Sequence, residues 1–96
     1  SSGFDIATIF CEQQNLPTPK KCIGIEVASE KIHPMALMTV TKGIEDLKAN
    51  IESITRVNHE KFAFLLKVSG ADLQTTVKAM SELRFDTTPD IRVFSL

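Results

Sequence analysis

The chain has 96 residues, of which 43% are hydrophobic and 24% are charged, and its formal net charge is -1. A chain of this length builds one small core, which excludes two independently folded domains. The near-neutral charge gives no electrostatic footprint for nucleic acid or anionic lipid, and no apolar run approaches the ~20 residues that cross a bilayer.

The first 20 residues are predicted to form an N-terminal extension, distinct from a domain that spans residues 21–96. Apolar residues recur about one helical turn apart between Phe4 and Asn15, which predicts a short helix. A linker that contains Pro17 and Pro19 follows, and its prolines hold the backbone extended and turning.

Two cysteines, Cys11 and Cys22, flank this linker. A disulfide between them would close the loop and would require an oxidising compartment, periplasmic or extracellular. The alternative is two ordinary small apolar side chains. Neither cysteine has a His or Cys at zinc-ligand spacing, so the sequence predicts no metal site and no cofactor.

The main unit opens with a strand and a long helix. Ile23, Ile25 and Val27 alternate with small or polar residues, which predicts a strand with one apolar face. Pro34 suits a first helical turn, and apolar residues three and four apart then predict an amphipathic helix. This stripe comprises Leu37, Val40, Ile44, Leu47 and Ile51. Gly43 within the helix indicates close packing against a sheet, since glycine is otherwise costly there.

A hairpin is predicted next. Residues 51–57 are rich in β-branched side chains, and the polar residues 58–60 supply a turn. Apolar residues alternate again from Phe62 to Val68, which predicts a second strand beside the first.

A second helix and a last strand complete the domain. Helical spacing resumes from Leu73 to Arg84, with Ser69 or Asp72 as the candidate cap. Its predicted apolar stripe comprises Leu73, Val77, Met80 and Leu83. Residues 91–96 alternate as a strand, with Ile91 and Val93 on one face and Arg92 on the other.

The order β, α, β, β, α, β predicts an α+β domain of ferredoxin-like topology. In this topology a four-stranded antiparallel sheet carries both helices on one face. The opposite face is commonly buried by a second copy or a neighbouring domain. The topology hosts RNA readers, metal chaperones, ligand sensors and assembly subunits, so function has to come from particular residues.

Two function classes are disfavoured by the residues present. Lys61-Phe62-Ala63-Phe64-Leu65 resembles the aromatic strand of an RNA-recognition motif, but the usual glycine is Lys61 and the last ring is replaced by Lys67. We therefore expect Phe62 and Phe64 to be buried sheet residues, with no nucleic-acid partner. His33 and His59 lie at separate turns without a nucleophile or carboxylate at catalytic spacing, so no enzyme is predicted.

The segment from His33 to Ile54 resembles the ACT domain family without a gap. In that family a strand leads into an Arg-Pro-Gly-Leu-Leu type turn, and a helix with a Val/Ile-Thr-Lys/Arg core follows, matched here by Val40-Thr41-Lys42. An Asn-Ile pair, here Asn50-Ile51, then opens the second strand. The resemblance extends through the hairpin to the last strand and covers about residues 22–96.

The resemblance implies a small cytoplasmic regulatory domain that pairs with another copy, often into a continuous eight-stranded sheet. Many members bind an amino acid where the first strand meets the first helix. By position, the ligand-binding residues here would be Ile32, His33, Pro34, Met35 and Asn50. Met35 stands where the family has a turn glycine, and Ile32 stands where it usually has an acidic residue. Both differences favour a pairing role over ligand binding.

A structural alternative has the same topology: a protein–protein interaction module of a membrane-anchored assembly, such as a periplasmic pilus-biogenesis or type II secretion component. A Cys11–Cys22 disulfide would favour this alternative, because an oxidised cross-link suits the periplasm. Two thiols with an amino-acid response would favour the cytoplasmic regulator. In both cases we expect a homodimer, or docking to a parent chain or partner protein.

Overall fold

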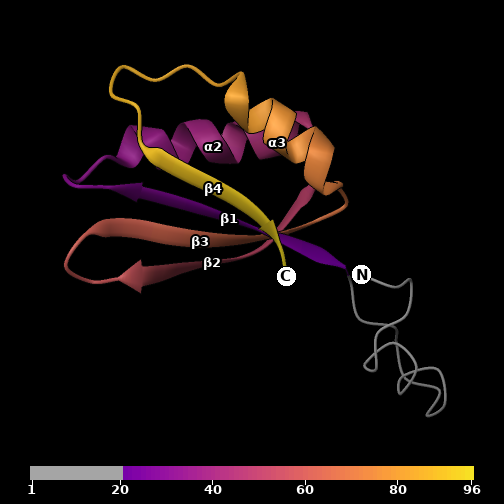
Figure 1. Ribbon diagram of the computed structural model, residues 1–96, viewed down its shortest axis with the longest axis horizontal. Coiled ribbons are helices and arrows are strands. Elements are labelled where there is room, and N and C mark those ends of the chain that lie inside the picture. The colour runs from indigo at the N-terminus through magenta and orange to yellow at the C-terminus, as the bar shows by residue number, and fades with distance from the viewer. Residues whose placement is uncertain (1–20) are drawn as a thin grey trace, which may run out of the picture.

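The computed structural model describes residues 21–96 (Figure 1). The helix predicted between Phe4 and Asn15 lies outside the described residues, as does Cys11. The elements are β1 (Cys22–Ser29), α2 (Pro34–Asp46), β2 (Asn50–Asn58), β3 (Phe62–Ser69), α3 (Leu73–Ser81) and β4 (Asp90–Ser95). The predicted order of strands and helices across residues 21–96 is confirmed.

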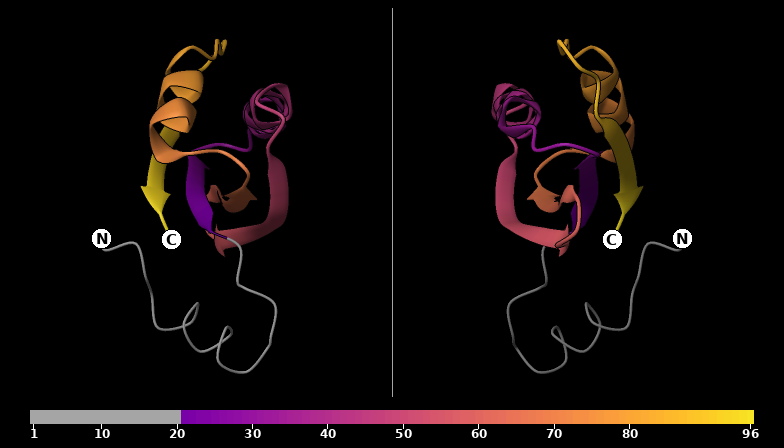
Figure 2. Two further views of the ribbon diagram at one scale, coloured as in Figure 1. Left: turned by 90° about the vertical axis from the view of Figure 1, so that its right-hand side faces the viewer. Right: turned by 90° about the vertical axis from the view of Figure 1, so that its left-hand side faces the viewer.

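The four strands form one sheet in the order β2-β3-β1-β4. β1 is antiparallel to β3 and β4, and β2 is antiparallel to β3. Consequently β1 and β2 run in the same direction with β3 between them, and α2 connects them. β3 and β4 likewise flank β1 and are connected by α3. Both helices lie on one face of the sheet (Figure 2), so the α+β class with a four-stranded antiparallel sheet is confirmed.

The core lies between this sheet face and the helices, and β1 runs through its centre. Ile25 and Val27 have no exposed surface, as the alternation of apolar residues in this strand predicts. The strand register places Ile25 opposite Leu66 of β3 and opposite Val93 of β4. The buried cluster comprises Ile23, Ile25, Val27, Ala36, Val40, Ile44, Leu66, Val68 and Met80.

α2 ends at Asp46, short of the predicted stripe that continued to Ile51. Lys48 adopts a left-handed backbone conformation with a φ of 59°, which reverses the chain after the helix. Ile51 then pairs with Val68 in the sheet. Its assignment to the helical stripe is therefore wrong, because helical spacing and strand alternation both place an apolar residue at this position.

Gly43 marks a close contact, but its neighbours are Met80 of α3 and Leu83, just beyond the end of that helix, rather than the sheet. A β-carbon built at Gly43 would lie 3.1 Å from Leu83 Cδ2 and 3.3 Å from Met80 Cε. The missing side chain lets the two helices approach, which offsets the helix-propensity cost of glycine. Close packing at Gly43 was predicted correctly, but the sheet was the wrong packing partner.

α3 begins after Asp72, whose carboxylate accepts a hydrogen bond from the backbone N–H of Thr75 at 2.7 Å. This backbone bond, together with the Thr75 side chain, lowers the pKa of Asp72. The cap is thus strongest with the carboxylate ionised. The choice between Ser69 and Asp72 as the cap is settled in favour of Asp72.

The buried face of α3 differs from the predicted stripe. Leu73 and Val77 are 36% and 47% exposed, whereas Thr76 and Met80 are buried. Thr76 is accommodated because its Oγ1 donates to the backbone carbonyl of Asp72 at 2.8 Å. The helix ends at Ser81, before the predicted Arg84. Met80 is buried and Leu83 packs against the core, as predicted. The prediction is wrong for Leu73 and Val77, and Thr76 takes a buried place beside Met80.

The sheet face opposite the helices carries a mixture of apolar and charged side chains. Phe94 of β4 lies against Gly24 of β1, where a β-carbon would come within 2.6 Å of the ring. Beside this contact, Arg92 Nη2 lies 3.0 Å from Glu26 Oε1. This face is therefore partly closed by its own cross-strand pairs.

Candidate functional site

The turn between β1 and α2 holds four of the five residues predicted to bind a ligand. Ile32 is 80% exposed and Met35 is 61% exposed; Pro34 is also exposed, and His33 is half-buried. Pro34 opens the helix, as its fixed backbone angle favours. The turn presents two large apolar side chains to solvent and no acidic group within Ile32–Met35.

His33 fastens this turn to the loop between α3 and β4. Its Nε2 lies 2.7 Å from the backbone carbonyl oxygen of Thr87, 54 positions along the chain. Because a carbonyl only accepts, this nitrogen carries the proton and donates. His33 is thus engaged in positioning two loops.

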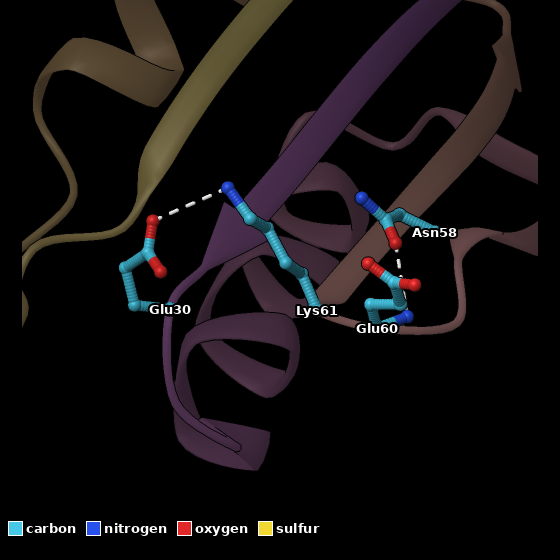
Figure 3. Close-up of polar contacts among 4 residues, drawn as sticks. All are labelled: Glu30, Asn58, Glu60 and Lys61. Carbon is cyan, nitrogen blue, oxygen red and sulfur yellow. Dashed lines mark hydrogen bonds and ion pairs between the residues drawn. The ribbon is translucent and has the colours of Figure 1, made fainter.

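A second contact lies just before the turn, between Glu30 and the hairpin that joins β2 to β3. Lys61 Nζ lies 3.3 Å from Glu30 Oε1, and the backbone N–H of Glu60 donates to Asn58 Oδ1 at 2.9 Å (Figure 3). The Asn58 bond shapes the tip of the β2–β3 hairpin, and the Lys61 pair links that tip to the segment before Ile32. Both side chains of the pair are largely exposed, so it contributes little to stability.

Asn50, the fifth predicted ligand residue, lies at the opposite end of α2. It opens β2 opposite Ser69 of β3 and packs near Gly70. α2 has 13 residues, which corresponds to about 20 Å of helix. Within one chain, Asn50 and the Ile32–Met35 turn are therefore too far apart to contact one amino acid together. The ligand role of these five residues stays a prediction.

The aromatic residues of β3 lie on the helix-covered side of the sheet. Phe62 and Phe64 are half-buried, and their ring centroids are 4.9 Å apart in an edge-to-face arrangement. The register places them in line with Leu66 and Val68. Both are sheet residues, as predicted, but they are half-buried rather than buried. Neither ring lies on the open face.

Among residues 21–96, no group of three or more His, Cys, Asp or Glu side chains is arranged to hold a metal ion. His59 is exposed at the hairpin tip, where its backbone carbonyl lies 3.4 Å from the guanidinium of Arg56. Cys22 is half-buried at the start of β1. A disulfide with Cys11 is one of the two alternatives that the sequence leaves open, and both stay predictions because Cys11 lies outside the described part of the chain.

The most exposed element is β2, an edge strand that no sequence pattern identifies as one. This strand lies at one edge of the sheet and has a hydrogen-bonded neighbour on one side. Every residue in it except Ile51 is exposed, including Ile54 at 47% and Val57 at 45%. An edge strand carries a row of backbone donors and acceptors that a further strand can pair with. Strand pattern alone does not reveal this, because edge position depends on sheet order.

The other edge strand, β4, is a weaker candidate for an interaction surface. An open hollow of about 310 Å³ lies along β4 and is lined by Arg92, Val93 and Phe94. Its charged group, Arg92, already pairs with Glu26, and Phe94 lies over Gly24. The β2 edge is therefore the stronger candidate for an interaction surface.

No protein-family model matches the sequence, and no curated protein shows significant similarity to it. Across residues 21–96, no helix is long and apolar enough to cross a membrane.

Proposed function

We propose that this is a non-catalytic domain that works by pairing with a second copy of itself. The observation that carries the proposal is the β2 edge, which leaves Ile54 and Val57 close to half-exposed along a strand whose other exposed residues are polar. Exposed apolar groups beside unpaired backbone groups are stabilised when another strand adds to the sheet. A domain this small also leaves a large share of its surface exposed to solvent, and a partner would cover part of that surface.

We assign the domain to the ferredoxin-like topology and, within it, to the ACT-like regulatory domains. Two interlocked β-α-β units support the topology: β3 lies between β1 and β2, and β1 lies between β3 and β4. The turn at His33-Pro34, the helix that follows and Asn50 at the start of β2 support the resemblance. Regulation by such a domain consists of changing how the chains that carry it associate.

A small-molecule ligand, such as an amino acid, is a second part of this proposal. The observation that favours it is the Ile32–Met35 turn, which is exposed and is joined to the loop between α3 and β4 by the hydrogen bond of His33. Addition of pooled amino acids should then shift the backbone amide signals of Ile32, His33 and Met35 in heteronuclear NMR spectra. Unchanged signals at these three residues would leave pairing as the sole function.

The module of a membrane-anchored assembly is the competing proposal. It shares the pairing surface, and it differs in the oxidation state expected of Cys11 and Cys22. Mass measurement after alkylation without reductant distinguishes the two proposals. Two alkylated thiols would favour the regulator, and a protected pair would favour an oxidising compartment.

Self-association is the direct test of the pairing proposal. We expect sedimentation equilibrium to show a concentration-dependent dimer at micromolar to high micromolar concentrations, with an interface of about 1,200–2,000 Å² in total. A chain that remains monomeric throughout this range would contradict the proposal.

A further inference from the structure

No element within residues 21–96 covers the face of the sheet opposite the helices (Figure 2). The strand registers show which side chains lie on this open face, because opposed residues point to the same side of a sheet. β1 points its odd-numbered residues into the core, as the buried Ile25 shows, and its even-numbered residues to the open face. Apart from Cys22, the apolar residues that β1, β3 and β4 place there are Gly24, Ala28, Ala63, Leu65 and Phe94.

The backbone itself forms much of this apolar surface, because three of its five residues are glycine or alanine. Its two large side chains, Leu65 and Phe94, are half-buried. Beside them, Glu26 and Arg92 form an ion pair at 3.0 Å. The long side chain of Lys67 can keep its ammonium group in water at the border of a packed layer. A further layer can therefore approach the open face closely.

The sequence of residues 4–15 has the pattern of a helix that needs a surface to pack on. At 100° per residue, its apolar residues span about 220° of the predicted helix, with Phe10 near the centre of this apolar arc. They are Phe4, Ile6, Ala7, Ile9, Phe10 and Cys11. Asp5, Thr8 and Glu12 share the remaining polar arc. A short helix of this kind gains most of its stability from packing of its apolar side.

This segment is joined to the domain at the open face. Cys22, the first residue of β1, lies opposite Ser69 and points to that face. Residues 16–21 span at most about 20 Å, and a helix over residues 4–15 is about 18 Å long. The eight residues of β1 extend over about 26 Å, so such a helix fits along the open face within reach of its linker. The exposed Ile32 and Met35 lie beyond the opposite end of β1, further from Cys22.

We propose that residues 4–15 bind as a helix to the open face of their own chain, with the apolar arc against Leu65 and Phe94. The extension then forms a third layer, and the sheet lies between it and the two helices α2 and α3. Burial of apolar surface on both sides of the contact drives this binding. The inference goes beyond the proposed pairing through β2 and is independent of it, because the open face and the β2 edge are separate surfaces.

A nitroxide spin label tests where the segment binds. The label is attached to the full chain in the variant Thr8→Cys/Cys11→Ser/Cys22→Ser, since Thr8 lies on the polar arc and the centre of the apolar arc stays intact. It should broaden the backbone amide signals of Gly24 and Phe94 strongly, and those of α2 only weakly because the sheet lies between. Stronger broadening on α2 or α3 than on the open face, or equal broadening throughout, would overturn the proposal.

A mixed sample identifies the occupant of the open face. Spin-labelled chains without isotope enrichment are added to isotope-enriched chains without the label. The amide signals of Gly24 and Phe94 should then stay sharp, since each open face is covered by a segment of its own chain. Broadening of these signals in the mixture alone would mean that a second copy supplies the segment, and it would overturn the proposal while leaving self-association in place.

A charge placed in the segment tests the contact without any label. Phe10→Asp puts a carboxylate at the centre of the apolar arc, so it should release the segment and shift the amide signals of Leu65 and Phe94. Thr8→Asp adds the same charge on the polar arc and should leave both signals unchanged. The amide signal of the buried Ile25 should stay in place in both variants, which confirms that the domain is folded. Open-face signals that Phe10→Asp does not move would overturn the contact and leave the pairing through β2 standing.

Discussion

Replacing Ile25 by alanine is expected to lower the free energy of unfolding by about 2–5 kcal/mol. Ile25 has no exposed surface and stands on the central strand, between Leu66 on one side and Val93 on the other. Removing the outer atoms of this side chain leaves a cavity, and the neighbouring residues on β3 and β4 cannot move enough to fill it. Because small domains have a stability of about 5–15 kcal/mol, this loss brings the chain close to unfolding.

Urea denaturation followed by circular dichroism measures this loss. Wild type and variant must be compared at one protein concentration, since the proposed dimerisation would itself add stability. Ile54→Ala is the control, because Ile54 is 47% exposed in the isolated domain and its truncation should cost less than about 1 kcal/mol below the dimerisation range. Equal losses for the two variants would contradict the placement of the core.

The second large effect is expected at Gly43, where α2 and α3 approach. Valine at this position should lower the free energy of unfolding by about 1–3 kcal/mol, because its branches have no room beside Leu83 and Met80. Alanine should differ from wild type by less than about 1 kcal/mol. Its β-carbon needs a small movement of two flexible side-chain ends at 3.1 and 3.3 Å, and it gains about 1 kcal/mol of helix propensity.

Thermal unfolding of the Ala and Val variants side by side tests the helix contact. The Val variant should unfold at a clearly lower temperature than the Ala variant. The same midpoint for both would mean that the space beside Gly43 is not closed by α3.

The strands that cross the core were predictable because alternation is a local signal. Ile23, Ile25 and Val27 share one face in any half-buried strand, whatever packs on it. The helix faces were less predictable. Leu73 and Val77 have the right spacing for a buried stripe, but the orientation of α3 buries Thr76, and no local pattern encodes that orientation. Ile51 shows the same limit, since it suits the end of a helix and the start of a strand equally well.

The candidate ligand turn could be located from sequence, and its surroundings could not. Pro34 marks the start of α2, so the position of Ile32–Met35 follows from helix-start preferences. The contact of His33 with Thr87 joins positions 54 residues apart. No sequence motif predicts a contact over that separation. The separation of Asn50 from the turn, by contrast, follows from helix length alone.

The edge position of β2 could not be predicted from its own residues, because their spacing suits an inner strand equally well. It follows from the sheet order β2-β3-β1-β4, which depends on how distant segments of the chain pair.

Intermolecular NMR contacts test the pairing most directly. In a dimer mixed from isotope-labelled and unlabelled chains, the filtered spectrum should contain contacts between the β2 residues of one copy and the β2 residues of the other. A mixed dimer whose intermolecular contacts come from β4 or the open face of the sheet, with none from β2, would contradict the account.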